Sequence, residues 1–315
     1  VDSQMKTNLP DVYAVGDCAM VKNAQTGKDQ WSAMGSTANL AARAMAKSLN
    51  GAGYGYGGCL GTGVVRLLPS LNGGRTGLTE AQAKSAGYDT ASVTCVLDDK
   101  AHYYPGASSF VIKLTAETST RKLLGIQVFG PGAVDKITDT AVVGISQGMK
   151  LDDFDTLDFA YAPPFSTAIH PFVSACYILE NKIDGLLESM SPAEYAAGMA
   201  KGYTVLDVQP SPALPNARWI DLASVNAPID GLPKDAKLLL VCAKGKRGYF
   251  LQNRLKAYGY TGTKVLEGGA FFNDVKVPRD GKKLSADEIK RVKGLGCLQD
   301  KRYDDVFNVR VITRN

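Results

Sequence analysis

A short run of glycines and basic residues around Cys242 has the composition of an anion-binding loop. The preceding segment 238–241 is apolar throughout, which predicts a strand buried on both faces, and the spacing over 250–258 predicts a helix. Backbone N–H groups, a helix N-terminus and nearby cations all stabilise an anion in such a strand-to-helix turn. The cations here are Lys244, Lys246 and Arg247. We therefore predict that Cys242 is a thiolate near neutral pH, able to carry a persulfide or to face a bound oxyanion.

Two interpretations of Cys242 follow. Free cysteines are among the most buried residues, so an arbitrary cysteine is more often a small core residue at a strand end. Here Gly245 and Arg247 follow it by three and five positions, a spacing that resembles the active loop of rhodanese (sulfurtransferase) domains. Two flanking segments resemble that family's first strand and closing Gly-Gly segment, 203–208 and 265–272. The resemblance implies an α/β rhodanese-like domain over 189–282, with Cys242 and Arg247 as catalytic residues.

The composition is ordinary for a globular protein of two or three domains: 315 residues, 45% hydrophobic and 21% charged. A net charge of +5 without a basic stripe gives no support for nucleic-acid binding. No apolar stretch approaches about 20 residues and the N-terminus lacks a signal-peptide pattern, so we expect no membrane partner and a cytoplasmic protein. Six scattered cysteines and two histidines argue against a zinc site and a disulfide framework.

The N-terminal residues form a second candidate site. The segment 8–19 predicts a turn and then a short apolar strand that ends in Gly16 and Asp17. An aspartate at the carboxyl end of a buried strand can accept hydrogen bonds from a sugar-like hydroxyl, and it can equally cap a helix. The small residues that follow Trp31 predict a helix capped near 36–37 that runs to about 50.

This pair of segments resembles the last FAD-contacting part of the pyridine nucleotide-disulfide oxidoreductase family. The resemblance implies that residues 1–57 are the C-terminal segment of an FAD-binding domain. It further implies that Gly16, Asp17 and Ala38 bind FAD, with Asp17 on the ribityl chain and the following helix directed at the flavin ring. NAD(P)H is the implied reductant. Cys18 is expected only to pack.

An α+β domain is predicted after the glycine-rich linker 51–58. The segment 62–67 opens this domain, strand-like runs are predicted at 91–96, 109–114 and 123–129, and helices are predicted at 76–84 and 133–147. Thr79 and Gln82 have the spacing of a helix capping box. This pattern resembles the dimerisation domain of the same family over 58–188, which implies a homodimer.

Two tyrosine motifs narrow the resemblance. Tyr103 lies in His-Tyr-Tyr-Pro-Gly and Tyr161 in Phe-Ala-Tyr-Ala-Pro-Pro-Phe-Ser, and both motifs resemble the coenzyme A-disulfide reductase and NADH oxidase branch. That resemblance implies that both tyrosines reach the partner subunit's active site and position or protonate a thiol leaving group, which suits a neutral phenol. From the residues alone, packing beside proline turns is the simpler role for both. We expect His170 to be structural rather than catalytic.

The C-terminal part carries two further expectations. Residues 189–194 predict a linker. The tail 283–315 predicts a helix from Leu284 and a strand over 307–313 that either pairs back or starts a truncated further domain. The family begins with a strand followed by a Gly-x-Gly-x-x-Gly turn, but the glycines at 51–58 have no buried strand before them and are predicted to be a linker. The chain also lacks a redox cysteine in the family's position and a second dinucleotide fold, so we expect it to be the C-terminal part of a larger flavoprotein, incomplete alone.

The predicted fold class is therefore α/β and α+β: the tail of an FAD-binding domain, an α+β dimerisation domain and an α/β rhodanese-like domain. The predicted function is part of an FAD- and NAD(P)H-dependent reductase of CoA-disulfide, persulfide or polysulfide, with sulfane sulfur carried on Cys242. CoA-persulfide and thiosulfate are further candidate substrates. Two alternatives stay open: a stand-alone sulfurtransferase with an interaction domain, and a non-enzymatic dimerisation module without flavin chemistry.

Overall fold

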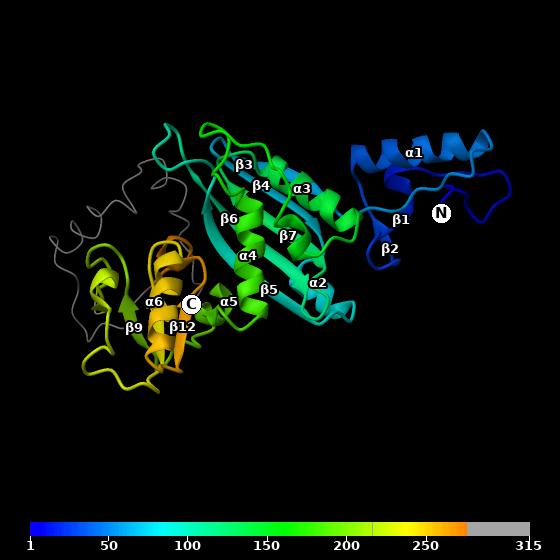
Figure 1. Cartoon of the computed structure of the whole chain (residues 1–315). Helices are drawn as coiled ribbons and strands as arrows, with labels where there is room; N and C mark the ends of the chain where they lie inside the picture. Colours follow the sequence, from blue (N-terminus) through cyan, green and yellow to red (C-terminus); the bar gives the residue numbers. More distant parts are fainter. Residues whose placement is uncertain (216, 276–315) are drawn as a thin grey trace, which may run out of the picture.

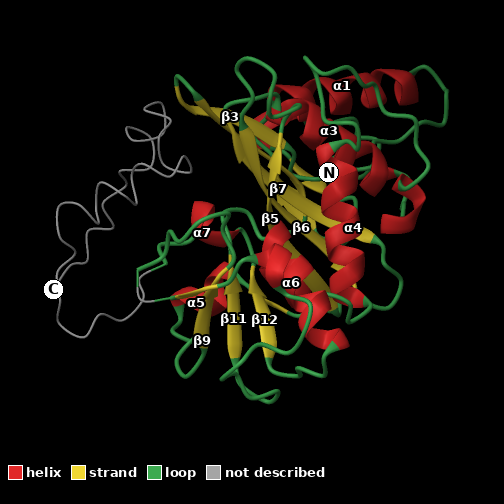
Figure 2. Cartoon of the chain, turned by 60° about the vertical axis from the view of Figure 1, so that its left-hand side comes forward, coloured by secondary structure: helices red, strands yellow, loops and turns green. Residues whose placement is uncertain are grey.

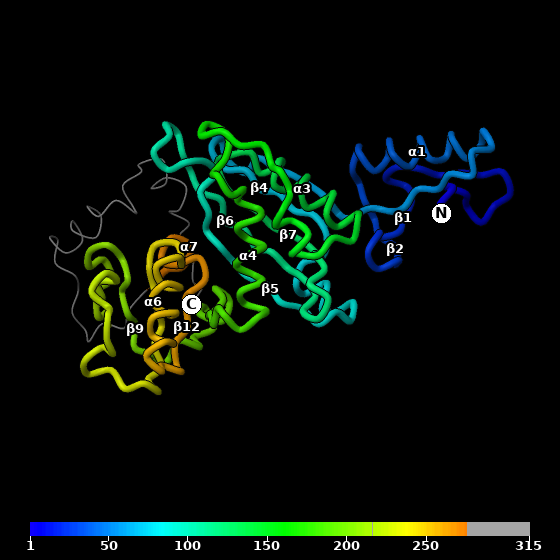
Figure 3. Tube along the Cα trace, in the orientation of Figure 1, coloured from blue at the N-terminus to red at the C-terminus, as the bar shows by residue number. Residues whose placement is uncertain are grey.

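The computed structural model describes residues 1–215 and 217–275, and it has three parts arranged along the chain. Figure 1 shows the N-terminal segment at one end, an antiparallel sheet with helices in the middle, and a smaller parallel sheet at the other end. Figure 3 shows the backbone trace between α1 (Gly35–Leu49) and the middle sheet. This connection contains no regular helix or strand. The chain therefore folds as consecutive units, each built from neighbouring sequence.

The N-terminal segment contains four short elements, which are η1 (Gly16–Cys18), β1 (Met20–Lys22), β2 (Asp29–Trp31) and α1. The apolar strand predicted ahead of η1 is wrong, because the structure has only an isolated bridge between Lys6 and Tyr13 there. A strand without a neighbour along its length is not stable. The predicted helix is present but begins earlier, with Met34 as its N-cap. Thr37 does not cap it, since its hydroxyl hydrogen-bonds to that of Ser32 at 2.8 Å.

The middle sheet is antiparallel, with strand order β3-β4-β7-β6-β5. Its strands are β3 (Gly63–Leu68), β4 (Leu71–Gly77), β5 (Thr90–Asp98), β6 (Ser109–Glu117) and β7 (Leu123–Gly130). Its helices are α2 (Glu80–Ser85), α3 (Val134–Ser146), η2 (Leu151–Phe154) and α4 (Pro171–Ile183). Helices α3 and α4 cover one face of this sheet (Figure 1). The predicted capping box is confirmed, since Thr79 and Gln82 each bond the other's backbone N–H.

Strand β4 is absent from the sequence prediction because its glycines are typical of a turn. A Cβ added at Gly74 would lie 2.3 Å from Thr138 Oγ1, and one added at Gly73 would lie 3.1 Å from the Phe129 ring. Gly74 therefore allows α3 to pack directly on the strand, and Gly73 leaves room for the Phe129 ring of the neighbouring strand. The other predicted strands and helices of this part of the chain are present.

The smaller sheet is entirely parallel, with strand order β10-β9-β11-β12-β8. Its strands are β8 (Ser189–Met190), β9 (Thr204–Asp207), β10 (Arg218–Trp219), β11 (Leu238–Val241) and β12 (Thr263–Leu266). Its helices are α5 (Pro192–Ala196), η3 (Leu222–Ser224), α6 (Lys246–Ala257) and α7 (Gly269–Phe272). Figure 2 shows its strands running side by side below the middle sheet, with α7 between the two sheets.

The linker predicted over 189–194 is wrong. Ser189–Met190 pairs with β12 as an edge strand, and Ser191 caps α5 through a capping box with Glu194. Both elements are too short to give a periodic hydrophobic pattern. The Ser-x-x-Glu spacing of Ser191 and Glu194 was nevertheless a sequence signal for the start of α5. The expected helix and strand of the tail 283–315 lie outside the described residues. No helix in the described ranges is long and apolar enough to cross a membrane.

Candidate functional site

Cys242 directly follows the central strand of the smaller sheet. β11 lies between β9 and β12, and all of its residues are fully buried, as the apolar segment predicted. Carboxyl ends of parallel strands meet at one edge of a sheet, which is where open α/β folds place their ligands. Cys242 is 3% exposed and is followed within four residues by α6. Its predicted place in a strand-to-helix turn is therefore confirmed.

The Cys242 sulfur accepts a hydrogen bond from the end of this turn. The backbone N–H of Gly245 donates to Cys242 Sγ at 3.1 Å. Gly245 is the N-cap of α6 and has φ of 98°, in the left-handed region that favours glycine. The sulfur thus faces a helix N-terminus, where unpaired N–H groups and the helix dipole stabilise negative charge. The arrangement suits a thiolate or the terminal sulfur of a persulfide.

The start of α7 holds the other side of the turn. Ala270 N–H donates to the Cys242 carbonyl and Phe271 N–H donates to the Ala243 carbonyl, both at 2.9 Å. A Cβ added at Gly269 would lie 2.3 Å from the Cys242 carbonyl oxygen. Only glycine allows this close approach of backbone to backbone. The closing Gly-Gly segment is therefore a structural part of the Cys242 loop.

The basic side chains of the loop do not all face the sulfur, contrary to the sequence prediction. Lys244 Nζ donates instead to Asp98 Oδ1 and, at 2.8 Å, to Ser109 Oγ, both on the middle sheet. Lys246 lies over an aromatic ring of its own helix. Arg247 lies in the first turn of α6, and its side chain is exposed. Of the three cations, Lys244 is thus neutralised by a carboxylate.

The buried aspartate that ends β9 is structural. Asp207 is fully buried and accepts backbone hydrogen bonds from Gln209 at 3.0 Å, Ala213 at 2.7 Å and Leu214 at 2.9 Å. A buried carboxylate requires such partners. Because β9 is paired with β11, these bonds shape the loop that lies next to the carboxyl end of the central strand.

Glu267 joins the smaller sheet to the middle one. Its Oε1 accepts from Lys182 Nζ and from Ser189 Oγ, both at 2.6 Å, and its Oε2 accepts from Thr94 N–H at 2.8 Å. Glu267 is 4% exposed, and Lys182 also donates to the Ser92 carbonyl at 2.8 Å. The partners are between 78 and 173 positions away in sequence. No local pattern could indicate this residue, and the sequence analysis missed it.

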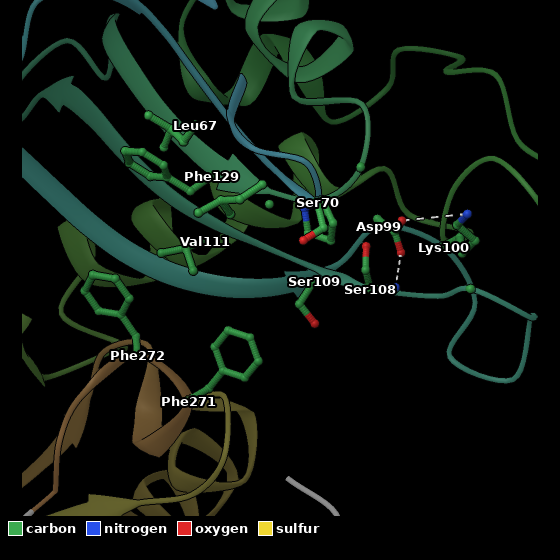
Figure 4. A pocket seen from close by; sticks show the side chains of 15 residues that line it. Leu67, Ser70, Asp99, Lys100, Ser108, Ser109, Val111, Phe129, Phe271 and Phe272 are labelled. Atoms are coloured by element: carbon green, nitrogen blue, oxygen red, sulfur yellow. Dashed lines mark hydrogen bonds and ion pairs between the residues drawn. The ribbon is translucent and has the colours of Figure 1, made fainter. Parts of the chain in front are cut away.

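A cleft of about 490 Å³ lies beside the Cys242 loop, between α7 and the face of the middle sheet opposite α3 (Figure 4). Phe271 and Phe272 face Val111 and Phe129 from the two sides. Because Phe271 also holds the Ala243 carbonyl, one wall of the cleft is continuous with the loop. The aromatic lining suits the apolar part of a small ligand.

The two candidate tyrosines are exposed. Tyr103 is 69% exposed and Tyr161 is 52% exposed. Neither hydroxyl has a hydrogen-bond partner within the described part of the chain. Their loops, 99–108 and 155–170, project from the same end of the middle sheet (Figure 1). The structure therefore leaves both phenols available to another molecule.

His170 belongs to the core of the middle domain. It is 4% exposed, its Nδ1 accepts from Phe172 N–H at 3.3 Å at the start of α4, and its ring stacks on Phe159 at 4.7 Å. Burial, with a smaller effect of Lys136, lowers the pKa of His170 to about 4. The histidine is thus neutral at neutral pH and caps a helix, which agrees with the structural role predicted for it.

The residues proposed to contact FAD fit a ligand of that kind. Asp17 is exposed on η1 and forms no side-chain hydrogen bond with the described residues. It is not a helix N-cap, so the capping alternative for it is wrong. Gly16 has φ of 81°, and a Cβ added there would reach only ordinary contact, 3.7 Å, with Ala38. The N-terminus of α1 has no side-chain cap. A free carboxylate next to an open helix N-terminus can bind hydroxyl and acceptor groups together.

Comparison with known families identifies the two sheet domains. Residues 69–172 match the pyridine nucleotide-disulphide oxidoreductase dimerisation domain, and residues 178–271 match the rhodanese-like domain. This chain joins these two domains. The predicted resemblance and fold class are therefore confirmed, with the α+β dimerisation domain as the middle sheet and the α/β rhodanese-like domain as the smaller one. The exact domain boundaries stay a prediction.

Several proteins that are similar to this chain have names of redox enzymes. The chain is 32% identical over 179 residues to a CoA-dependent NAD(P)H sulfur oxidoreductase of Pyrococcus furiosus. The aligned residues cover 57% of this chain and 40% of that protein. It is 31% identical to the structure of an NAD-dependent persulfide reductase from A. fulgidus, with a TM-score of 0.79 over 85% of this chain and 50% of that one. It is 28% identical to the structure of reduced Bacillus anthracis CoADR-RHD, with a TM-score of 0.78 over 86% of this chain and 49% of that one. The chain thus spans about half or less of the length of these relatives.

Proposed function

We propose that this chain is the sulfur-carrying and dimerisation part of an FAD- and NAD(P)H-dependent reductase of CoA-disulfide, persulfide or polysulfide. The observation that carries the proposal is the hydrogen bond from the Gly245 N–H to Cys242 Sγ at a helix N-terminus. The names of the relatives give the redox context. Free thiols at all five described cysteines agree with a reducing cytoplasm.

In the first step, the Cys242 thiolate attacks the outer sulfur of a polysulfide or of thiosulfate. The donor's S–S bond breaks, and its electron pair leaves with the shortened polysulfide or with sulfite. The new S–S bond makes Cys242 a persulfide, whose negative terminal sulfur is stabilised by the loop amides and by the exposed guanidinium of Arg247. Because Cys242 is 3% exposed, small donors are favoured.

In the second step, an acceptor thiolate such as that of coenzyme A attacks the outer sulfur of the Cys242 persulfide. Cys242 leaves as a thiolate, and the acceptor becomes a persulfide. Its reduction consumes one NAD(P)H and one proton and yields the thiol, hydrogen sulfide and NAD(P)+. When bound, FAD would pass the electron pair from NAD(P)H to the sulfur substrate. The Asp17 carboxylate would accept a hydrogen bond from a ribityl hydroxyl. The small residues Gly16 and Ala38 would allow FAD to approach the backbone closely.

The dimerisation domain supports a homodimer. We propose that Tyr103 and Tyr161 complete the active site of the partner subunit, where a phenol can donate a proton to a leaving thiolate. Their exposure and their lack of partners within the described residues support this assignment.

Sulfur loading tests the proposal. The chain is incubated with polysulfide or thiosulfate, desalted and treated with cyanide, and the released thiocyanate is measured. We expect cyanide-labile sulfur on the wild type and none above background on Cys242→Ser. Equal loading of the two would remove Cys242 as the carrier. Loading without any NAD(P)H oxidation by the intact natural protein would favour the stand-alone sulfurtransferase.

A further inference from the structure

The dimerisation domain holds a residue of the Cys242 loop. Lys244 lies two positions after Cys242, and its Nζ donates to Asp98 Oδ1 and to Ser109 Oγ at 2.8 Å. Ser109 Oγ also donates to Asp98 Oδ1 at 3.2 Å. Asp98 ends β5, Ser109 begins β6, and the two are direct partners in the antiparallel register. The ammonium therefore binds a preformed carboxylate and hydroxyl pair at the end of a hairpin.

This anchor, the contact of Lys244 with Asp98 and Ser109, lies next to the N–H group that donates to the Cys242 sulfur. The peptide between Lys244 and Gly245 carries the N–H that donates to Cys242 Sγ. Glycine has wide backbone freedom, so the conformation of Gly245 must be fixed by its surroundings. On one side, α7 holds the carbonyls of Cys242 and Ala243. On the other side, the side chain of Lys244 is the contact that connects the loop to a rigid sheet.

The anchor itself is in a fixed place. Glu267 is bound by Lys182 of α4 and by the backbone of Thr94 in β5, so the smaller domain is tied to the strand that ends in Asp98. The side chains of Lys244 and Asp98 are 35% and 34% exposed. Ion pairs with this exposure contribute little to overall stability, so the contact is better suited to orienting the loop than to holding the fold together.

We propose that Asp98 and Ser109 of the dimerisation domain are positioning residues for the sulfur-carrying loop. Neither touches the sulfur. They bind Lys244, and through it they orient the Gly245 N–H toward Cys242 Sγ. They also neutralise the Lys244 ammonium, so that the loop amides and Arg247 are the groups left to stabilise the sulfur anion. This inference rests on the proposed function of Cys242 as the sulfur carrier.

The test measures the rate of Cys242 persulfide formation from polysulfide in the full chain. Asp98→Ala and Lys244→Met are each expected to lower the limiting rate about threefold to tenfold, with the half-saturating polysulfide concentration unchanged. The double variant should be no slower than the slower single one, because both changes remove one contact. Lys244→Arg should keep most of the rate, since it can still bind the carboxylate. Asp89→Ala is the matched control, on an exposed aspartate at the opposite end of β5.

Three results separate the possible outcomes. Rates for Asp98→Ala and Lys244→Met equal to that of the wild type would overturn the positioning role and leave the sulfur-carrier proposal intact. Effects that multiply in the double variant would also overturn it. A wild type that does not load sulfur at all would instead refute the proposed function. Circular dichroism establishes that each variant is folded, and Asp98→Asn replaces Asp98→Ala if the latter is not.

Discussion

Replacement of Glu267 by leucine should loosen the junction between the two domains. The substitution removes a carboxylate that accepts three hydrogen bonds. The Lys182 ammonium and the Thr94 N–H then lose this acceptor. Breaking a buried ion pair by removing one partner typically costs about 3–5 kcal/mol. Lys182 is 27% exposed and keeps its bond to the Ser92 carbonyl, so we expect the lower end, about 3 kcal/mol.

Urea unfolding measures this loss. Far-ultraviolet circular dichroism follows the whole chain, while tryptophan fluorescence adds the local signals of Trp31 and Trp219. For Glu267→Leu we expect a lower midpoint and transitions that no longer coincide, because the rhodanese-like domain unfolds separately. Glu188→Leu is the control. Its side chain is 49% exposed beside Lys256, so its effect should stay within about 0.5 kcal/mol.

A double-mutant cycle tests the reason for the loss. Lys182→Met in the Glu267→Leu background removes the unpaired ammonium, so the double variant should be more stable than Glu267→Leu alone. A loss below about 1 kcal/mol for Glu267→Leu would refute the reasoning. So would strictly additive effects of the two substitutions, since they would mean that Glu267 and Lys182 do not interact.

Three other predictions follow from single residues. The low pKa of His170 in the folded protein means that the unfolded chain binds a proton first on acidification. Stability should therefore fall as the pH is lowered from about 6.5 to about 4. His170→Gln should flatten this dependence in unfolding measured at several pH values. Gly74→Ala should cost about 1–3 kcal/mol through overlap with Thr138, whereas Gly63→Ala, with open space at its Cβ, should be tolerated in thermal unfolding. Sedimentation should give a dimer, and a monomer at micromolar concentration would remove the role of Tyr103 in a partner subunit.

Local patterns predicted most of the two sheets. The apolar run of β11, the alternating strands of the middle sheet and the Thr79 capping box each depend on neighbouring residues, which the sequence displays directly. The Cys242 turn could also be predicted, because a strand, glycines and a helix occur in order. The errors arose where tertiary packing decides the outcome. In β4, Gly74 makes room for α3 and Gly73 makes room for the Phe129 ring of β7.

The contacts between domains could not be predicted in this way. Lys244 was expected to face the sulfur because it lies in the same loop. Its partner Asp98 lies 146 positions earlier in the chain, so no local pattern connects the two residues. Glu267 gave no signal for the same reason, since a single glutamate after a strand has no distinguishing pattern. In both cases the charge was visible in the sequence, but its partner was fixed only by the docking of the rhodanese-like domain on β5.

Peptide mapping of the sulfur-loaded chain tests the central claim most directly. After brief treatment with polysulfide, exposed thiols and persulfides are alkylated, and mass spectrometry locates the extra sulfur atom. The account predicts that it lies on the peptide containing Cys242, although Cys18 is the exposed cysteine of the described residues and Cys242 is buried. Extra sulfur on Cys18 but not on Cys242 would mean that simple accessibility controls the reaction, and it would contradict the assignment of Cys242 as the carrier.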